Sequence, residues 1–399
     1  MPPGPPPMPE VVWPDQEPEH LDGPLQERLD HWMTLVHRGN VIEAYRVFLG
    51  LMANPAERKE VLAQLMHAGL MDVQDRALYN RSYTTGHKAF RARATVELGN
   101  LLGWDNAHNV IYAGALDIAV GPRWYSTYEM ACNVVKIFLE KQAVSAIPYG
   151  GASKEELAIL ANNREPLSRD EAEALERACI RETEPGFLEL LSKYLEAGKS
   201  PRRILDALQI ADAQVVMETQ GVNNFSLPQH CYEYLNTLGW FFDNFEHKQQ
   251  VKLLYLAASY LNRAAWHQKG IGDAEPITVR VPGGADKLSP QQILDRVDAA
   301  VLALNGEDSR NWTQAYIESG AEKKPLVQRL ALLASRMGND PHNQEIGQVL
   351  LEDYAKNQGW NRDRLLVACA HHTAVHRKYG NPLDCATRFG EAMGIARLQ

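Results

Sequence analysis

The amino-acid sequence predicts an all-α protein, built as an array of antiparallel helix pairs with one short extended crossover near residues 275–285. Three observations predict this class. Apolar residues recur with the helical period of about 3.6 residues almost everywhere after residue 25. Short connections containing Gly, Pro and Asn separate the periodic stretches, as in helical arrays. One stretch alone has the alternating, β-branched pattern of a strand.

The N-terminal part of the periodic region predicts a helical hairpin. In the stretch 25–39 the apolar side chains fall on one side of a helix, which Gly39 can terminate. The stretch 40–53 repeats the period and stops before Asn54 and Pro55, and proline is suited to the first turn of the next helix. Two helices joined by a Gly-Asn turn form an antiparallel pair.

The rest of the chain continues in the same manner. Ser153 and Ser168 each precede a helical stretch and have a Glu three residues later, in the style of a capping box. The C-terminal third contains four further helical stretches, 289–304, 325–338, 343–359 and 361–380. The segment 270–288 differs, because its core 277–281 is β-branched and alternating between prolines. Since no partner strand is evident, we expect an extended crossover between helical layers.

The same patterns predict how the chain is divided. Residues 1–24 are Pro-rich and cannot bury a core, so we expect a disordered leader followed by a single helical domain over 25–399. A weak internal duplication is plausible between 105–140 and 227–264, where each stretch contains two helices and begins with His-x-x-x-Tyr.

Composition excludes several partners and compartments. The net charge of -9 and the lack of any Lys/Arg-rich run argue against nucleic acid. No apolar run approaches the roughly 20 residues that span a membrane. The five cysteines are odd in number and form no C-x-x-C pair, which is typical of reduced thiols in a cytoplasmic protein.

The stretch 369–379, CAHHTAVHRKY, contains three of the thirteen histidines. On a helix, His372 and His376 are neighbours at spacing i, i+4, whereas His371 turns about 100° away. Such a pair can bind zinc, but Thr373 stands where zinc proteases have their catalytic Glu. The pair is therefore a candidate for metal binding with ligands from elsewhere, for acid–base work, or for purely structural hydrogen bonding.

A second pattern places a histidine four residues before a tyrosine near two predicted helix starts. His108 with Tyr112 and His230 with Tyr234 fall on the apolar side of their helices. The dipole at a helix N-terminus favours neutral imidazole, the form that a metal ligand or general base requires. The alternative is a core His-Tyr pair that holds helices in register. After the first of these helices, Arg123 lies in an aromatic turn of a kind that often lines pockets.

No nucleotide-binding, nucleophile-elbow or calcium motif occurs, and no two helices carry the E-x-x-H of di-iron bundles. The stretches HNVIYAGALDIAV, LPQHCYEYLNTLGWFF and ACAHHTAVHRKYG resemble the questin-oxidase-like proteins. That all-helical group is associated with oxidative tailoring of polyketide-derived aromatic compounds. The resemblance implies an oxidoreductase, and it carries no residue roles over to this chain.

These observations lead to one main hypothesis. The chain is expected to be an oxygenase or oxidoreductase that acts on a small hydrophobic or aromatic substrate between helices. Its candidate metal ligands are His108, His230, His372 and His376. Its candidate catalytic residues are Tyr112, Tyr234 and Arg123. Imidazoles suit Fe, Cu and Zn alike, so the metal stays open. The alternative is a non-catalytic helical-repeat scaffold whose concave face binds a protein.

Overall fold

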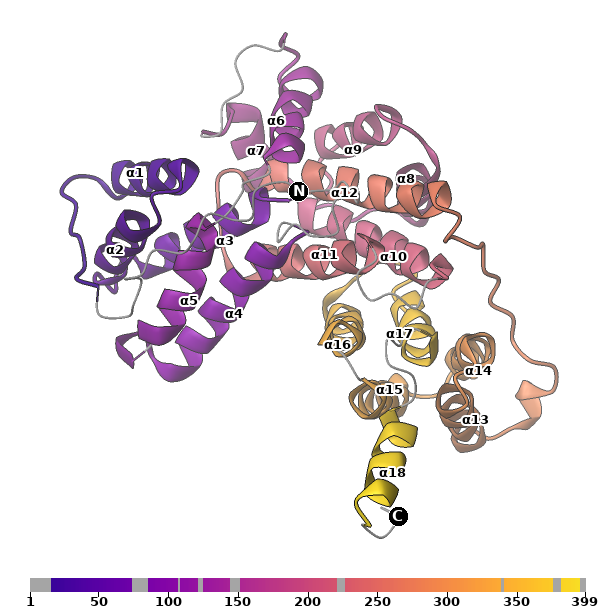
Figure 1. The fold of residues 1–399 in the computed structure, drawn as a ribbon. Coiled ribbons are helices and arrows are strands. Elements are labelled where there is room, and N and C mark those ends of the chain that lie inside the picture. The colour runs from indigo at the N-terminus through magenta and orange to yellow at the C-terminus, as the bar shows by residue number, and fades with distance from the viewer. Residues whose placement is uncertain are drawn as a thin grey trace. The chain divides into compact units, whose positions relative to one another are not determined.

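The computed structural model describes residues 16–73, 85–106, 108–120, 125–143, 151–220, 227–338, 341–375 and 382–394. In these residues the chain forms eighteen α-helices, and its β-structure is limited to isolated bridges (Figure 1). The predicted all-α class is therefore confirmed. The helices fall into two compact units. Unit 1 comprises residues 1–165, 188–202 and 237–260, and unit 2 comprises residues 166–187, 203–236 and 261–399.

Unit 1 contains the helices from the N-terminal half of the chain. They are α1 (Leu25–Arg38), α2 (Val41–Met52), α3 (Arg58–Met71), α4 (His87–Leu102), α5 (His108–Ala119), α6 (Ser126–Phe138), α7 (Lys154–Asn162) and most of α9 (Gly186–Glu196). Helix α3 contacts α1, α2, α4 and α5, and every residue from Val61 to Met71 is buried. A Cβ atom at Gly69 would lie 2.8 Å from the carbonyl oxygen of Lys88, so glycine allows α3 and α4 to approach closely.

Three of the predicted helix ends agree with the structure, whereas the expected helix start at Pro55 is wrong, because residues 55–57 form a turn and α3 begins at Arg58. Gly39 terminates α1 in the left-handed conformation, with φ of 74°. Ser153 caps α7 and exchanges hydrogen bonds with Glu156, and Ser168 does the same with Glu171 at the start of α8 (Arg169–Arg181). These two capping boxes are confirmed.

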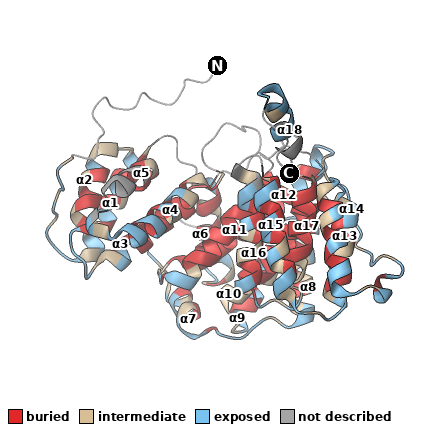
Figure 2. Ribbon diagram, turned by 90° about the horizontal axis from the view of Figure 1, so that it is seen from below, coloured by how far each residue is buried: buried red, intermediate tan, exposed pale blue. Residues whose placement is uncertain are grey.

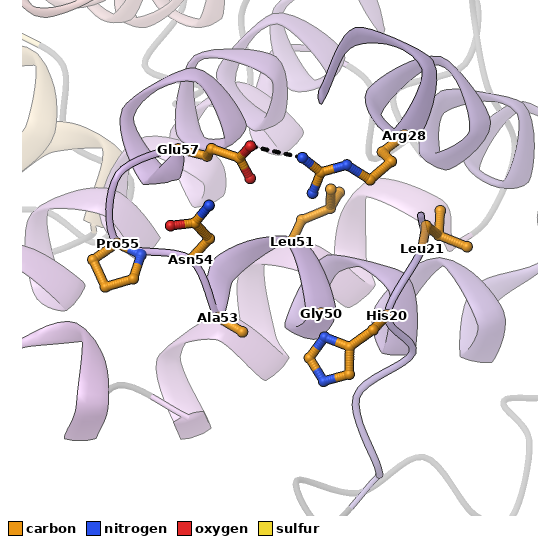
Figure 3. Close-up of a pocket in the computed structure, with 9 residues that line it drawn as sticks. All are labelled: His20, Leu21, Arg28, Gly50, Leu51, Ala53, Asn54, Pro55 and Glu57. Carbon is orange, nitrogen blue, oxygen red and sulfur yellow. Dashed lines mark hydrogen bonds and ion pairs between the residues drawn. The ribbon is translucent and has the colours of Figure 1, made fainter. Parts of the chain in front are cut away.

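Residues 16–24 lie against α2. The Glu19 N–H donates to the Arg46 carbonyl at 2.9 Å, and the Glu19 carbonyl passes so close to Gly50 that a Cβ atom there would have no room. His20 and Leu21 of this segment line a hollow of about 430 Å³, and in its wall Arg28 pairs with Glu57 at 2.7 Å (Figure 3). Residues 16–24, which belong to the expected disordered leader over 1–24, are therefore ordered. Residues 1–15 lie outside the described residues.

Unit 2 contains the helices from the C-terminal half, together with α8. The C-terminal helices are α13 (Pro290–Leu302), α14 (Gly306–Glu318), α15 (Lys323–Met337), α16 (Pro341–Lys356), α17 (Arg364–Val375) and α18 (Pro382–Ala392). Besides α9, three helices are divided between the units, namely α10 (Pro201–Glu218), α11 (Leu227–Asn244) and α12 (Gln250–Gly270).

The core of unit 2 forms around α17. This helix contacts α13, α14, α15 and α16, and its residues from Leu365 to Ala370 are fully buried. Helix α18 differs from α17, because it is largely exposed (Figure 2). Phe389 within α18 is 64% exposed, and Met393, the residue after its end, is 63% exposed. Apolar side chains are buried on all sides of α17. Their burial stabilises the folded unit by about 25 cal/mol for each Å² of apolar surface removed from water.

The extended crossover is confirmed. Residues 275–282 form no helix and continue from an isolated bridge between Thr219 and Ala274. Ile277 and Val279 alternate toward the core of unit 2, which explains the strand-like sequence without any sheet. The Asn311 side chain accepts a hydrogen bond from the Arg280 N–H at 2.9 Å and so satisfies part of the exposed backbone. Across the described residues, no helix combines the length and apolar character needed to cross a membrane.

Candidate metal centre

Within unit 2, the first part of α11 and helix α16 carry the same short motif. Helix α11 carries His230 and Glu233, and helix α16 carries His342 and Glu345. Both motifs read His-x-x-Glu, and residues three apart lie on the same face of a helix. Each motif lies in the first turns of its helix, so two imidazoles and two carboxyl groups gather from segments far apart in the sequence.

The distances between these groups are short. Nδ1 of His342 lies 3.1 Å from Oε1 of Glu233 and 3.5 Å from Oε2 of Glu345. One ligand atom from each of these three residues lies within 4.8 Å of the others, and the same limit holds between ring nitrogens of His230 and His342. The centroids of the two imidazole rings are 4.8 Å apart.

A further hydrogen bond fixes α16 beside α11. The Asn236 side-chain N–H donates to Oδ1 of Asp353 at 2.9 Å, and both residues are buried. Such a bond between buried side chains costs more to break than an exposed one, because water is not at hand to replace the lost partner. The helices that carry the four groups are therefore held in a defined register.

The Glu233 carboxyl group is the most unusual member. It is 4% exposed, and its Oε2 atom has no hydrogen-bond partner among the described residues. Burial raises the pKa of Glu233 to about 7, against the opposing effect of the hydrogen bond with His342. A buried carboxyl oxygen without a donor costs free energy, and a cation is one of the few partners that can satisfy it.

The donor set is suited to a metal ion. Protein ligand atoms lie about 2.0 to 2.2 Å from a bound zinc, so ligands of one ion are roughly 3 to 4 Å from each other. The ligand atoms of Glu233, His342 and Glu345, and ring nitrogens of His230 and His342, lie within 4.8 Å of each other, which is close to that range. Two imidazoles with one carboxylate are the ligand set of many non-haem Fe(II) oxygenases, and Glu345 adds a second, half-exposed carboxylate.

Some of the predicted site residues are among the described residues, and others are not. His230 is 3% exposed and belongs to the centre, whereas Tyr234 on the same helix is fully buried. His372 is fully buried on α17, where its Nε2 accepts a hydrogen bond from the Gln229 side chain at 3.0 Å. Among the described residues it is not part of the converging ligand groups. It is a neighbour of the centre through Gln229, the residue before His230.

His371 and the remaining predicted residues have different outcomes. Nδ1 of His371 donates to the Gly306 carbonyl at 3.0 Å, and burial lowers its pKa to about 4. The expectation that His371 lies outside any site stays a prediction. Arg123 and His376 lie outside the described residues. His108 and Tyr112 belong to α5, but their side chains are also outside the description. The predicted duplication is compatible with the helix pairs α5–α6 and α11–α12 and stays a prediction.

Three members of the centre were not predicted, namely Glu233, His342 and Glu345. The signal that could have found them is the repeated His-x-x-Glu, which occurs as HCYE at 230–233 and HNQE at 342–345. It has the same residue types and spacing as the E-x-x-H of metal-binding bundles, in reverse order.

A buried acid on the neighbouring helix α10 gives a test of the electrostatics of unit 2. Asp212 is fully buried beside the Cys231 thiol, and neither carboxyl oxygen has a hydrogen-bond partner from an N–H or O–H group of the described residues. Burial raises the pKa of Asp212 well above its usual range. The folded state therefore keeps this proton at pH values at which the unfolded chain has released it.

Asp212→Asn is expected to change how stability depends on pH. As pH rises above about 4, the Asp212 of the unfolded chain ionises first, so the wild-type free energy of unfolding falls by up to about 1.4 kcal/mol per pH unit. The Asn variant resembles the protonated acid and lacks this loss. Urea unfolding at pH 4, 5, 6 and 7 should show the variant gaining on the wild type as pH rises. Parallel profiles would contradict the raised pKa.

Comparison with known proteins assigns no relative. No protein-family model matches the sequence, and neither the curated proteins nor the solved structures searched give a match.

Proposed function

We propose that the chain is a metal-dependent oxygenase or oxidoreductase that acts on a small hydrophobic or aromatic substrate. His230, Glu233 and His342 are its metal ligands, and Glu345 is a fourth. The observation that carries the proposal is the convergence of two His-x-x-Glu motifs around the buried Glu233 carboxyl group, whose Oε2 atom has no partner among the described residues. The resemblance to questin-oxidase-like proteins supports the same class of reaction.

The proposed ligand set also supports a role in catalysis over a purely structural one. Structural zinc sites are typically closed by four Cys or His ligands, whereas two imidazoles and a carboxylate leave coordination positions for oxygen and substrate. Glu345 is about half exposed, so one side of the set faces solvent. Iron is the metal that this set favours, and zinc and manganese share its ligand preferences.

The non-catalytic scaffold remains the alternative function. A repeat scaffold that binds a protein partner would present its distinctive residues on an exposed face. His230 and Glu233 are instead almost fully buried, at 3% and 4% exposure. An imidazole and a carboxyl group are thus both buried, and one oxygen of the carboxyl group has no hydrogen-bond partner among the described residues. This arrangement favours the enzyme.

Metal content tests the proposal directly. We expect protein reconstituted anaerobically with Fe(II), then passed through a desalting column, to retain about one equivalent of iron by elemental analysis. Zn(II) and Mn(II) are tested in parallel, because the ligand types also suit them. Retention of no metal in any of the three samples, with the protein folded by circular dichroism, would reject the proposed centre.

A further inference from the structure

Unit 1 contains a pocket of about 610 Å³ that the proposed function does not use. Its walls come from α7, from the start of α10, and from the end of α11 with the connection to α12. The residues that matter for its chemistry are Leu160, Arg164, Phe242, Phe245, His247 and Lys248. All of them lie in residue ranges that belong to unit 1.

The positive charges of the pocket are unevenly satisfied. Arg202 also lines the pocket, but it is paired with Asp243 through two hydrogen bonds of 2.8 and 3.2 Å. Among the described residues, the acceptors of Arg164 are backbone carbonyls, including that of Asn163 at 2.7 Å. Lys248 has no carboxylate or other hydrogen-bond partner among the described residues. The exposed Glu246 is the acidic residue of the lining, so cations outnumber acids there.

An apolar surface adjoins these cations. Phe245 is 8% exposed, and Phe242 and Leu160 are half-buried where they line the pocket. Ligand pockets typically combine such apolar walls with a few polar groups that fix orientation. An anion with an apolar body would supply the partner that Lys248 lacks and would remove water from the phenylalanine rings.

The histidine in the lining is held rigidly. Nδ1 of His247 accepts from the Gln249 N–H at 3.3 Å, which leaves Nε2–H to donate to Oε1 of Gln64 at 3.3 Å. Its ring stacks on the buried His67 at a centroid distance of 4.2 Å. Burial, with the nearby Lys248 and Lys252, lowers the pKa of His247 to about 3, so the ring is neutral at pH 7. His247 therefore forms a flat, fixed wall and leaves the charge to Lys248 and Arg164.

We propose that this pocket is a binding site for an organic carboxylate with an aromatic or branched aliphatic body. The carboxylate is bound by Lys248 and Arg164, and the apolar body packs on Phe242 and Phe245. The inference is independent of the metal centre, because none of its residues belongs to unit 2.

The test uses 2-naphthoate as the probe and its neutral amide, 2-naphthamide, as the uncharged counterpart. Calorimetric titration of the full chain at low salt is expected to show naphthoate binding at least about 10-fold more tightly than naphthamide. Lys248→Gln should reduce that preference, because only Arg164 then binds the carboxylate, and Phe242→Ala should weaken the binding of both probes. NMR spectra should show the imidazole resonances of His247 shifting on saturation with naphthoate.

The matched control is Lys154→Gln, which removes the same charge from the first residue of α7. Lys154 is outside the pocket lining, and its side chain is 91% exposed. The control should bind naphthoate as the wild type does. Equal affinity of Lys248→Gln and Lys154→Gln for naphthoate would overturn the proposal, as would equal binding of the two probes by the wild type. Absence of naphthoate binding at millimolar concentration would also overturn it.

Discussion

Lys252→Met is expected to lower the free energy of unfolding by about 3 to 5 kcal/mol, because it leaves an acid buried without its cation. Nζ of Lys252 lies 3.0 Å from Oε2 of Glu156 and 2.8 Å from the Gly151 carbonyl. The two side chains of the pair are 5% and 1% exposed. Oε2 of Glu156 also accepts from the Ser153 N–H at 2.9 Å, so the ion pair and the capping box of α7 share one carboxylate.

Two comparisons isolate the effect of burial. The double variant Lys252→Met/Glu156→Gln should recover part of the loss, because no uncompensated charge remains. Lys356→Met removes the partner of Glu352 in an ion pair whose Lys356 and Glu352 side chains are 39% and 20% exposed. It should lower the free energy of unfolding by less than about 1 kcal/mol. Urea unfolding at pH 7 measures all three. A loss in Lys252→Met no larger than that in Lys356→Met would contradict the assignment of a buried ion pair.

His230→Ala and His342→Ala are each expected to weaken metal binding by more than about 100-fold. Even residues that only orient metal ligands typically contribute 10- to 100-fold to affinity, so losing a ligand should cost more. Glu233→Gln should have a similar effect, since it removes the buried carboxylate. Glu345→Gln should have the smallest effect, because this side chain is 51% exposed and water can replace it.

Competition with a chromophoric chelator measures these affinities. His31→Ala is the control, since His31 is exposed on α1 in unit 1 and should leave the affinity unchanged. Circular dichroism at each step separates loss of metal from loss of fold. The centre would be disproved by folded His230→Ala and His342→Ala variants that bind Fe(II), Zn(II) and Mn(II) as tightly as the wild type does.

Most of the fold could be predicted from the sequence, because the signals are local. The helical period, the capping serines and the terminal glycine act within a few residues, so Gly39, Ser153 and Ser168 have the roles that their neighbours indicate. The crossover was recognisable for the same reason, since its alternating pattern and flanking prolines stand apart. The division into two compact units was not predicted, because it depends on contacts between distant segments.

The candidate site was predicted only in part, and the reason is also physical. His230 could be selected from its helical face, but its partners on α16 lie more than one hundred positions away, as the separation of 109 between Glu233 and His342 shows. A pattern within one helix does not determine which helix faces it. The i, i+4 pair of His372 and His376 was selected on local geometry alone, and the structure instead pairs His372 with Gln229.

The contact between residues 16–24 and α2 has a consequence for how position 50 can vary. A side chain at position 50 and the backbone of Glu19 compete for the same space, so the two arrangements exclude each other. The identity of one residue on α2 thus controls whether a segment about thirty positions earlier can lie there. Gly50→Leu is therefore a way to release that segment without deleting any of it.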